Sequence, residues 1–116
     1  MIQSKPPSLP STPPLTPLPS QPSLTPLPSL PLGRLVSTPG AIHAMATNAI
    51  DPVILLQRHR TGDWGELDPE DWAANDAARR NGGRILSAYH LDDKTTLWVI
   101  TEADRNSTCI LRPDEY

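Results

Sequence analysis

Proline most constrains what this chain can fold into, because its distribution divides the sequence into two unlike parts. Eleven of the 15 prolines lie within residues 1–33. Proline fixes φ near about −65° and has no backbone N–H to donate, so a segment interrupted by it every few residues builds neither helix nor sheet. We therefore predict that residues 1–33 are a disordered, polyproline-like tail outside the core, and that residues 34–116 are one folded domain.

Residues 34–116 have the composition of a small globular domain. They contain 9 Lys and Arg, 13 Asp and Glu, all three tryptophans and both tyrosines. A domain of this size buries only about 60–65% of its unfolded surface, so it has one modest core and little room for a large internal active site. The excess of acidic groups opposes nucleic-acid binding, unless Arg79, Arg80 and Arg84 gather on one face.

Cysteine usage and hydropathy bear on compartment and cofactors. The single cysteine, Cys109, cannot form an internal disulfide, which favours a reducing cytoplasm. No stretch resembles a membrane span or the apolar part of a secretory signal, so we expect no membrane partner. No spacing among His43, His59, His90 and Cys109 matches a zinc signature, and no phosphate-binding or dinucleotide-binding glycine loop occurs. We therefore expect neither a metal nor a cofactor.

Three prolines of the domain mark helix starts. Pro39, Pro52 and Pro69 each follow a threonine or an aspartate, which is the pattern of an N-cap with proline at the first helical position. The second helix carries four consecutive apolar residues at 53–56, so we predict that it is the central core helix. The predicted helices span residues 39–48, 52–60 and 69–81, the last ended by Asn81-Gly82-Gly83.

After Gly83 the apolar residues recur with a period of two, which is typical of strands. Three runs separated by short polar turns predict an antiparallel meander, at residues 84–91, 94–102 and 107–112. Leu35 and Val36 are candidates for a fourth, edge strand. The predicted class is α+β, with three short helices on one face of a three-stranded or four-stranded antiparallel sheet. The middle strand is apolar on both faces, so Trp98 is either covered by further chain or exposed as a contact surface.

The densest polar cluster lies at residues 59–66. Glycines on both sides of Asp63 and Trp64 permit a tight bend, so this loop, with Glu66, is a candidate binding site. In the structural alternative, Asp63 accepts backbone N–H bonds and Trp64 fills the edge of the core. His59 stands beside the loop and is either a hydrogen-bonded or solvated histidine, or a catalytic one.

A second cluster stands at the predicted turn between the last two strands. Its carboxylates, Glu102 and Asp104, and its guanidinium, Arg105, could form a charged turn. Alternatively, the two carboxylates could be a pair that the guanidinium orients for general acid–base chemistry. If the chain is an enzyme, the candidate catalytic residues are His59, Tyr89, Glu102 and Arg105, with His90 nearby. The candidate binding residues are Asp63, Trp64, Glu66, Glu102, Asp104 and Arg105.

Two strings, GDWGELD at residues 62–68 and WVITEADR at 98–105, lie within a longer resemblance over residues 32–116. This region resembles a family of small bacterial proteins of plasmids and other mobile elements, some of them labelled type I restriction endonuclease subunit M. A DNA methyltransferase subunit needs a glycine-rich methyl-donor loop and an Asn-Pro-Pro-aromatic motif, and the domain has neither. The resemblance therefore implies a genomic neighbourhood rather than a reaction.

Three functions compete for this sequence. Small size, an acidic surface and the lack of a complete catalytic set favour a non-enzymatic accessory protein of a mobile element that binds a protein partner. Scattered His, Tyr, Glu and Arg residues would suit a small RNase or toxin-like enzyme. The negative charge would suit an acidic anti-restriction protein, although nine basic residues dilute it.

Overall fold

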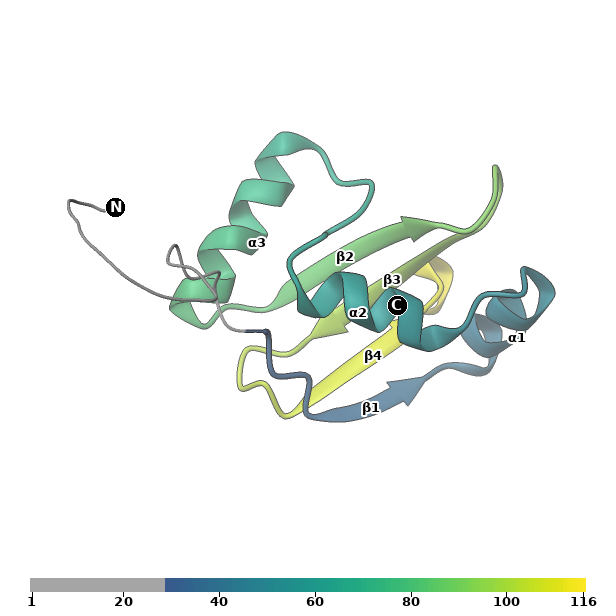
Figure 1. The fold of residues 1–116 in the computed structure, drawn as a ribbon, viewed down its shortest axis with the longest axis horizontal. Helices are drawn as coiled ribbons and strands as arrows, with labels where there is room; N and C mark the ends of the chain where they lie inside the picture. The colour runs from purple at the N-terminus through teal and green to yellow at the C-terminus, as the bar shows by residue number, and fades with distance from the viewer. Residues whose placement is uncertain (1–28) are drawn as a thin grey trace, which may run out of the picture.

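The computed structural model describes residues 29–116, which form a mixed four-stranded sheet with three α-helices (Figure 1). This confirms the α+β class. Residues 1–28 of the predicted tail lie outside the part of the chain that the structure describes. The elements are β1 (Arg34–Ser37), α1 (Pro39–Thr47), α2 (Pro52–Arg60), α3 (Pro69–Asn81), β2 (Ile85–His90), β3 (Thr96–Thr101), β4 (Ser107–Leu111) and the 3-10 helix η1 (Pro113–Glu115).

The predicted helix starts are confirmed by their capping bonds. Thr38, Asp51 and Asp68 each accept a backbone N–H bond from the first turn of the following helix, at 3.2, 2.9 and 2.8 Å. Gly82 ends α3 in the left-handed conformation with φ of 90°, where a side chain would be strained. None of the helices within residues 29–116 is long and apolar enough to cross a membrane.

The strand order is β1-β4-β3-β2, and β2, β3 and β4 form the predicted antiparallel meander. The candidate fourth strand is present as β1, but it runs parallel to β4, so the expectation of a wholly antiparallel sheet is wrong. The turn into β1 explains this direction. Gly33 has φ of 66° and lies so close to the backbone of Asn106 that a Cβ would come within 2.5 Å of it. The chain therefore enters β1 at the end of the sheet where β4 begins.

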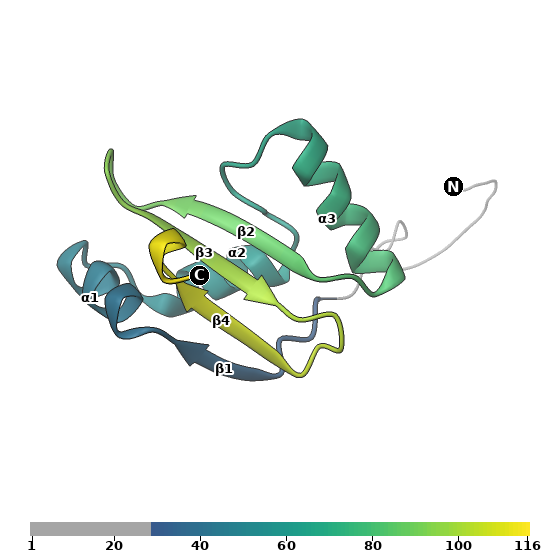
Figure 2. The ribbon, with the colours of Figure 1, turned by 180° about the vertical axis from the view of Figure 1, so that it is seen from behind.

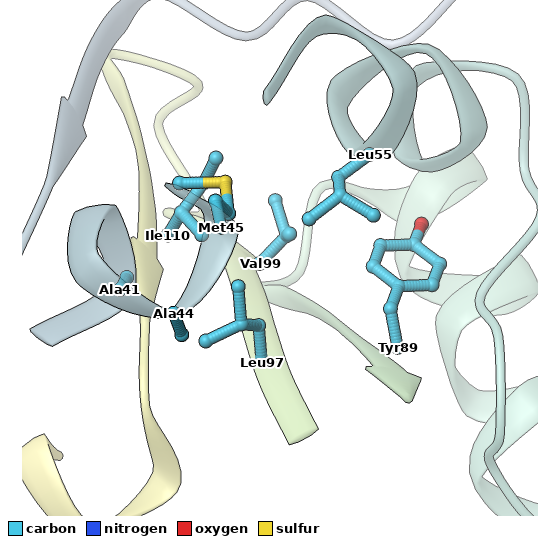
Figure 3. Close-up of a cluster of buried hydrophobic side chains, with 8 residues drawn as sticks. All are labelled: Ala41, Ala44, Met45, Leu55, Tyr89, Leu97, Val99 and Ile110. Atoms are coloured by element: carbon cyan, nitrogen blue, oxygen red, sulfur yellow. The ribbon is translucent and has the colours of Figure 1, made fainter. Parts of the chain in front are cut away.

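Helices α1 and α2 and the C-terminus lie on opposite faces of the sheet, while α3 lies beside the outer edge of β2. α2 crosses one face, with α1 at one end of it, and η1 lies on the other face, as the view from behind shows (Figure 2). On this second face the rings of Trp98 and Tyr116 meet edge to face, with centroids 5.7 Å apart, so the C-terminal segment covers Trp98 in part. The main core lies under α1 and α2 (Figure 3) and consists of Ala41, Ala44, Met45, Leu55, Tyr89, Leu97, Val99 and Ile110.

The predicted domain boundary at residue 34 lies too late. Leu30 is only 3% exposed and packs in a second apolar cluster with Trp64 and Ile85. Its N–H donates to the carbonyl of Arg60 at 2.9 Å. Leu30 can make this bond because it keeps the backbone N–H that its proline neighbours lack, so the folded domain includes residues 30–33.

The prediction that α2 is the central core helix is wrong. Its buried residues are Leu55 and His59, whereas Val53 and Ile54 are 58% and 56% exposed. A helix that lies on one face of a sheet buries a single stripe, and four consecutive apolar residues cannot all fall on that stripe. α2 is therefore a surface helix with two large apolar side chains in contact with solvent.

The outer edge of β2 is closed by the α2–α3 loop. The Ala88 N–H donates to the carbonyl of Trp64 at 3.1 Å, and the Ala88 carbonyl accepts from the Glu66 N–H at 2.7 Å. The Glu66 carboxylate accepts the next outward N–H, that of His90, at 3.1 Å. The unpaired backbone groups of an open sheet edge can bind a strand of another chain, and at β2 this loop occupies those groups.

Asn75 of α3 closes the remaining position of this edge, and we expect its loss to be costly. Its buried side chain donates to the Leu86 carbonyl at 2.7 Å and accepts the Leu86 N–H at 3.3 Å. Asn75→Ala leaves both groups unpaired, so the free energy of unfolding should fall by about 1–3 kcal/mol in urea denaturation. Asn81→Ala, the same substitution at the exposed last residue of this helix, should change it by less than about 0.5 kcal/mol. Equal effects of the two substitutions would contradict this role.

Candidate functional site

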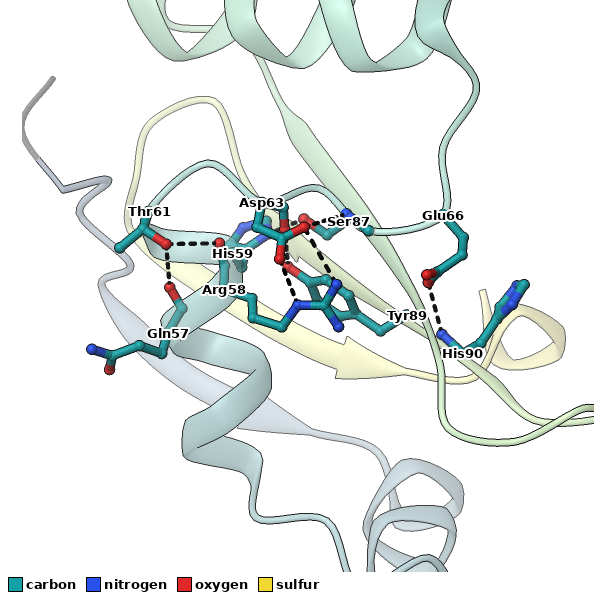
Figure 4. A network of polar contacts seen from close by, with 10 residues as sticks. Gln57, Arg58, His59, Thr61, Asp63, Glu66, Ser87, Tyr89 and His90 are labelled. Atoms are coloured by element: carbon teal, nitrogen blue, oxygen red, sulfur yellow. Dashed lines mark hydrogen bonds and ion pairs between the residues drawn. The ribbon is translucent and has the colours of Figure 1, made fainter. Parts of the chain in front are cut away.

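The structure places Asp63 in a network of contacts within its own loop (Figure 4). Two oxygens of its carboxylate accept from the Arg58 guanidinium, at 2.7 and 3.3 Å, and one also accepts the Gly65 N–H at 3.1 Å. The Arg58 hydrogen bond holds the pKa of the Asp63 carboxyl below its usual range. The acceptance of a backbone N–H bond is what the structural alternative predicts for this residue, although the carboxylate remains partly exposed.

Trp64 is fully buried, with 0% of its surface exposed. Its indole N–H donates to the Asp76 carboxylate at 2.9 Å, and its ring meets the edge of His59 at a centroid distance of 5.7 Å. Asp63 is partly exposed and Glu66 is exposed, but both carboxylates are bonded within the domain, that of Glu66 to the His90 N–H at the edge of β2. The loop therefore presents no indole to a partner, and its main contacts are with the rest of the domain.

His59 lies in a chain of buried hydroxyl groups. Its Nδ1 is 2.6 Å from Ser87 Oγ and its Nε2 is 2.8 Å from Thr101 Oγ1. Thr101 Oγ1 is 2.7 Å from Thr108 Oγ1, which donates its one proton to the Leu32 carbonyl at 2.7 Å. Thr101 must then donate to Thr108, so Nε2 carries the imidazole proton and Ser87 donates to Nδ1. Burial lowers the pKa of His59 to about 4, so the ring is neutral, fully bonded and out of reach of a substrate.

Tyr89 is also inaccessible. Its hydroxyl donates to the Asp63 backbone carbonyl at 2.7 Å, and the guanidinium carbon of Arg58 lies 4.4 Å from the centre of its ring. Burial raises the pKa of the Tyr89 hydroxyl, so it stays protonated at neutral pH. Tyr89 therefore fastens the loop to the sheet from within the core.

The second candidate cluster secures the end of α3. Arg105 donates to the carbonyls of Gly83 and Ala78 at 2.6 and 2.9 Å, close to the helix C-terminus, where a cation is favourable. Glu102 forms its ion pair with Arg84 instead, at 3.4 Å, and Asp104 accepts the Asn106 N–H in the turn at 2.9 Å. The guanidinium of Arg105 consequently does not orient the two carboxylates.

The candidate catalytic residues do not share an accessible surface. His59 of α2 and Tyr89 of β2 are buried in the interior, whereas Glu102 and Arg105 lie at the turn between β3 and β4. Within residues 29–116, no group of three or more His, Cys, Asp or Glu side chains is placed to hold a metal ion. Of the three arginines that could form a basic face, Arg79 and Arg80 line one hollow of about 680 Å³, together with Arg105. Arg84 does not line it; its guanidinium pairs with Glu102 and stacks over the Tyr116 ring.

A polar hollow of about 370 Å³ was not foreseen from the sequence. It lies between α1, the β2–β3 turn and the start of η1, three segments that no local pattern connects. Charged side chains of both signs line it, and Arg112 and Asp114 pair with each other there at 3.2 Å. The residues that give it its polar character are His43, Asn48, Asp92, Lys94, Arg112 and Asp114.

The edge of the sheet at β1 was also missed as a site. Arg34 donates its backbone N–H to the carbonyl of Asn106, just before β4, at 2.9 Å, and Thr38 donates its own to the carbonyl of Ile110 in β4 at 3.0 Å. Because backbone groups alternate in direction along a strand, Leu35 and Ser37 direct theirs away from the sheet. Leu35 and Val36 are 54% and 41% exposed, and no described element lies beyond this edge (Figure 1). The sequence signal was an apolar pair in a strand too short to bury it.

No family model matches the sequence, and no similar protein was found among curated proteins or solved structures. The resemblance to plasmid and mobile-element proteins therefore stays a prediction.

Proposed function

We propose that this chain is a non-enzymatic accessory protein that binds a protein partner, and that the open edge of β1 is its binding surface. The observation that supports this is the contrast between the two edges of the sheet. At β2, the outward N–H groups of three residues all have acceptors in the α2–α3 loop or Asn75. At β1, the outward groups of Leu35 and Ser37 have none among the described residues. An unpaired edge accepts an added strand through main-chain hydrogen bonds.

The placement of the candidate catalytic residues favours binding over catalysis. His59 has both ring nitrogens occupied by hydroxyl groups, and Arg105 is bonded to backbone carbonyls. General acid–base chemistry needs a titratable group within hydrogen-bond reach of the substrate, and neither His59 nor Tyr89 is exposed. The candidate residues therefore form no accessible catalytic set that would support the RNase or toxin-like alternative.

The chemistry of the β1 edge defines the partner that it fits. The partner supplies an extended segment whose N–H and C=O groups meet those of Leu35 and Ser37, with a small apolar side chain beside Val36. A strand of four residues offers far less than the roughly 800 Å² per partner of a standard interface, so the binding is weak and reversible.

Two substitutions at one position test this proposal. Ser37→Pro removes an outward N–H but no bond to β4, because the β1 donors to β4 alternate with it. Ser37→Ala removes only the hydroxyl group and is the matched control. We expect wild type and Ser37→Ala to recover the same partner from lysate of host cells that also express an untagged copy of this chain, and Ser37→Pro to lose it, with all three giving the same circular dichroism spectrum.

Two results would contradict the proposal. One is recovery of an identical set of proteins by all three variants, which would place any binding surface elsewhere. The other is cleavage of RNA by the purified wild-type chain, which would favour the toxin-like enzyme.

A further inference from the structure

We propose that the strand bound at β1 is β1 of a second copy of this chain, in antiparallel orientation, so that two four-stranded sheets join into one of eight strands. This inference rests on the proposed function, since it names the partner of the same edge. The position and direction of the unpaired backbone groups carry it.

The outward backbone groups of β1 are self-complementary. In an antiparallel pair, hydrogen-bonded residues exchange both of their N–H···O bonds. A two-fold axis beside Val36 sets Leu35 opposite Ser37 of the second copy, and Ser37 opposite its Leu35. Both outward residues are then paired on both strands, which satisfies every outward N–H and C=O group of the two residues. One closed two-fold contact accounts for the whole open edge.

The side chains fit the same register. The two Val36 residues face each other as a pair without hydrogen bonds between them, the geometry in which cross-strand side chains lie closest. Each is 41% exposed in the single chain, so the contact covers apolar surface. Arg34 falls opposite Thr38 of the second copy, which keeps the two guanidinium groups apart. No like charges meet across the strands.

The proline-rich segment of a second copy is a poorer occupant of this edge. It carries a proline every few residues, and each proline lacks the N–H that a ladder needs. The β2 edge of a second copy is also closed, by Trp64, Glu66 and Asn75. Among the described strands of this chain, β1 is therefore the edge strand whose outward backbone N–H and C=O groups are unpaired.

Cross-linking tests the register. In a Cys109→Ser background, needed because Cys109 lies beside Val36 in the β1–β4 register, we expect Val36→Cys to form a disulfide-linked dimer under mild oxidation. Arg34→Cys is the control on the same strand and the same sheet face. Its two Cα atoms would lie about 13 Å apart in the dimer, since strands rise about 3.3 Å per residue, and disulfides need about 7 Å or less. The Val36→Cys dimer should form at least about ten times faster.

Sedimentation of the full chain tests the association itself. We expect a monomer–dimer equilibrium across about 10–1000 µM, because so short a strand makes a weak contact. Ser37→Pro and Val36→Lys, which sets two cations opposite each other, should each weaken dimerisation at least about tenfold. Ser37→Ala should leave it unchanged.

The inference is overturned if the wild type stays monomeric throughout this range, or if Val36→Cys cross-links no faster than Arg34→Cys. If the wild type is monomeric but binds a different protein, and Ser37→Pro abolishes that binding, the inference is overturned and the proposed function stands. A monomer with no partner that depends on Ser37 would overturn both.

Discussion

Replacing Trp64 with alanine is expected to lower the free energy of unfolding by about 3–5 kcal/mol, the usual cost of truncating a fully buried aromatic residue. The indole has no exposed surface and packs with Leu30 and Ile85 in the second apolar cluster. Its removal also takes away the donor to the Asp76 carboxylate. A domain of about 88 residues has roughly 4–13 kcal/mol of stability, so the variant should be partly unfolded or melt far below the wild type.

Trp64→Phe separates the two parts of this effect. Phenylalanine keeps most of the apolar volume but not the N–H, so its loss should be smaller, about 1–2 kcal/mol. Circular dichroism in urea measures both variants, since Trp72 and Trp98 would complicate a fluorescence signal. A loss below about 1 kcal/mol for Trp64→Ala would contradict the buried position and return Trp64 to the candidate binding residues.

The helices and the meander could be predicted because their signals are local. An N-cap side chain bonds to an N–H two or three residues away, so Thr38, Asp51 and Asp68 act within their own turns. The period-two pattern of apolar residues that predicts β2, β3 and β4 likewise depends only on neighbouring residues. These elements needed no knowledge of the rest of the chain.

The direction of β1 and the burial of Leu30 depend on residues far apart in sequence. Arg34 bonds to Asn106, and Gly33 lies against the same backbone, more than 70 residues later. Leu30 is buried because Trp64 and Ile85 come together beside it. No pattern within residues 29–37 contains this information, so a composition argument placed the boundary too late.

The candidate site was misjudged because residue type does not reveal burial. A tryptophan between two glycines and a histidine beside a loop are equally compatible with a surface site and a core. In this fold α3 and the segment at residue 30 pack over the loop, which encloses Trp64, while α2 turns His59 onto the sheet. The open edge of β1 was hidden for a related reason, since the strand order decides which edge is free.

The stability of the domain is expected to fall between pH 7 and pH 5 by about 2 kcal/mol through His59 alone. Burial, with a smaller contribution from the charge of Arg105, lowers the pKa of His59 from 6.5 to about 4. As the pH falls, the unfolded chain takes up this proton first, so protonation favours unfolding. The stabilisation is present above the unfolded pKa and is lost progressively as the pH falls from about 6.5 towards 4.

Urea denaturation of wild type and His59→Gln at pH 7 and pH 5 measures this difference. Glutamine keeps a donor for Thr101 but has no proton to gain, so the fall in stability should be about 2 kcal/mol smaller in the variant. His43 and His90 are exposed and present in both proteins, so the difference between the two slopes isolates His59. If the variant does not fold, an NMR titration of the wild-type imidazole should give a midpoint near 4. Equal slopes, or an imidazole that titrates near 6.5, would contradict the closed hydroxyl chain around this ring.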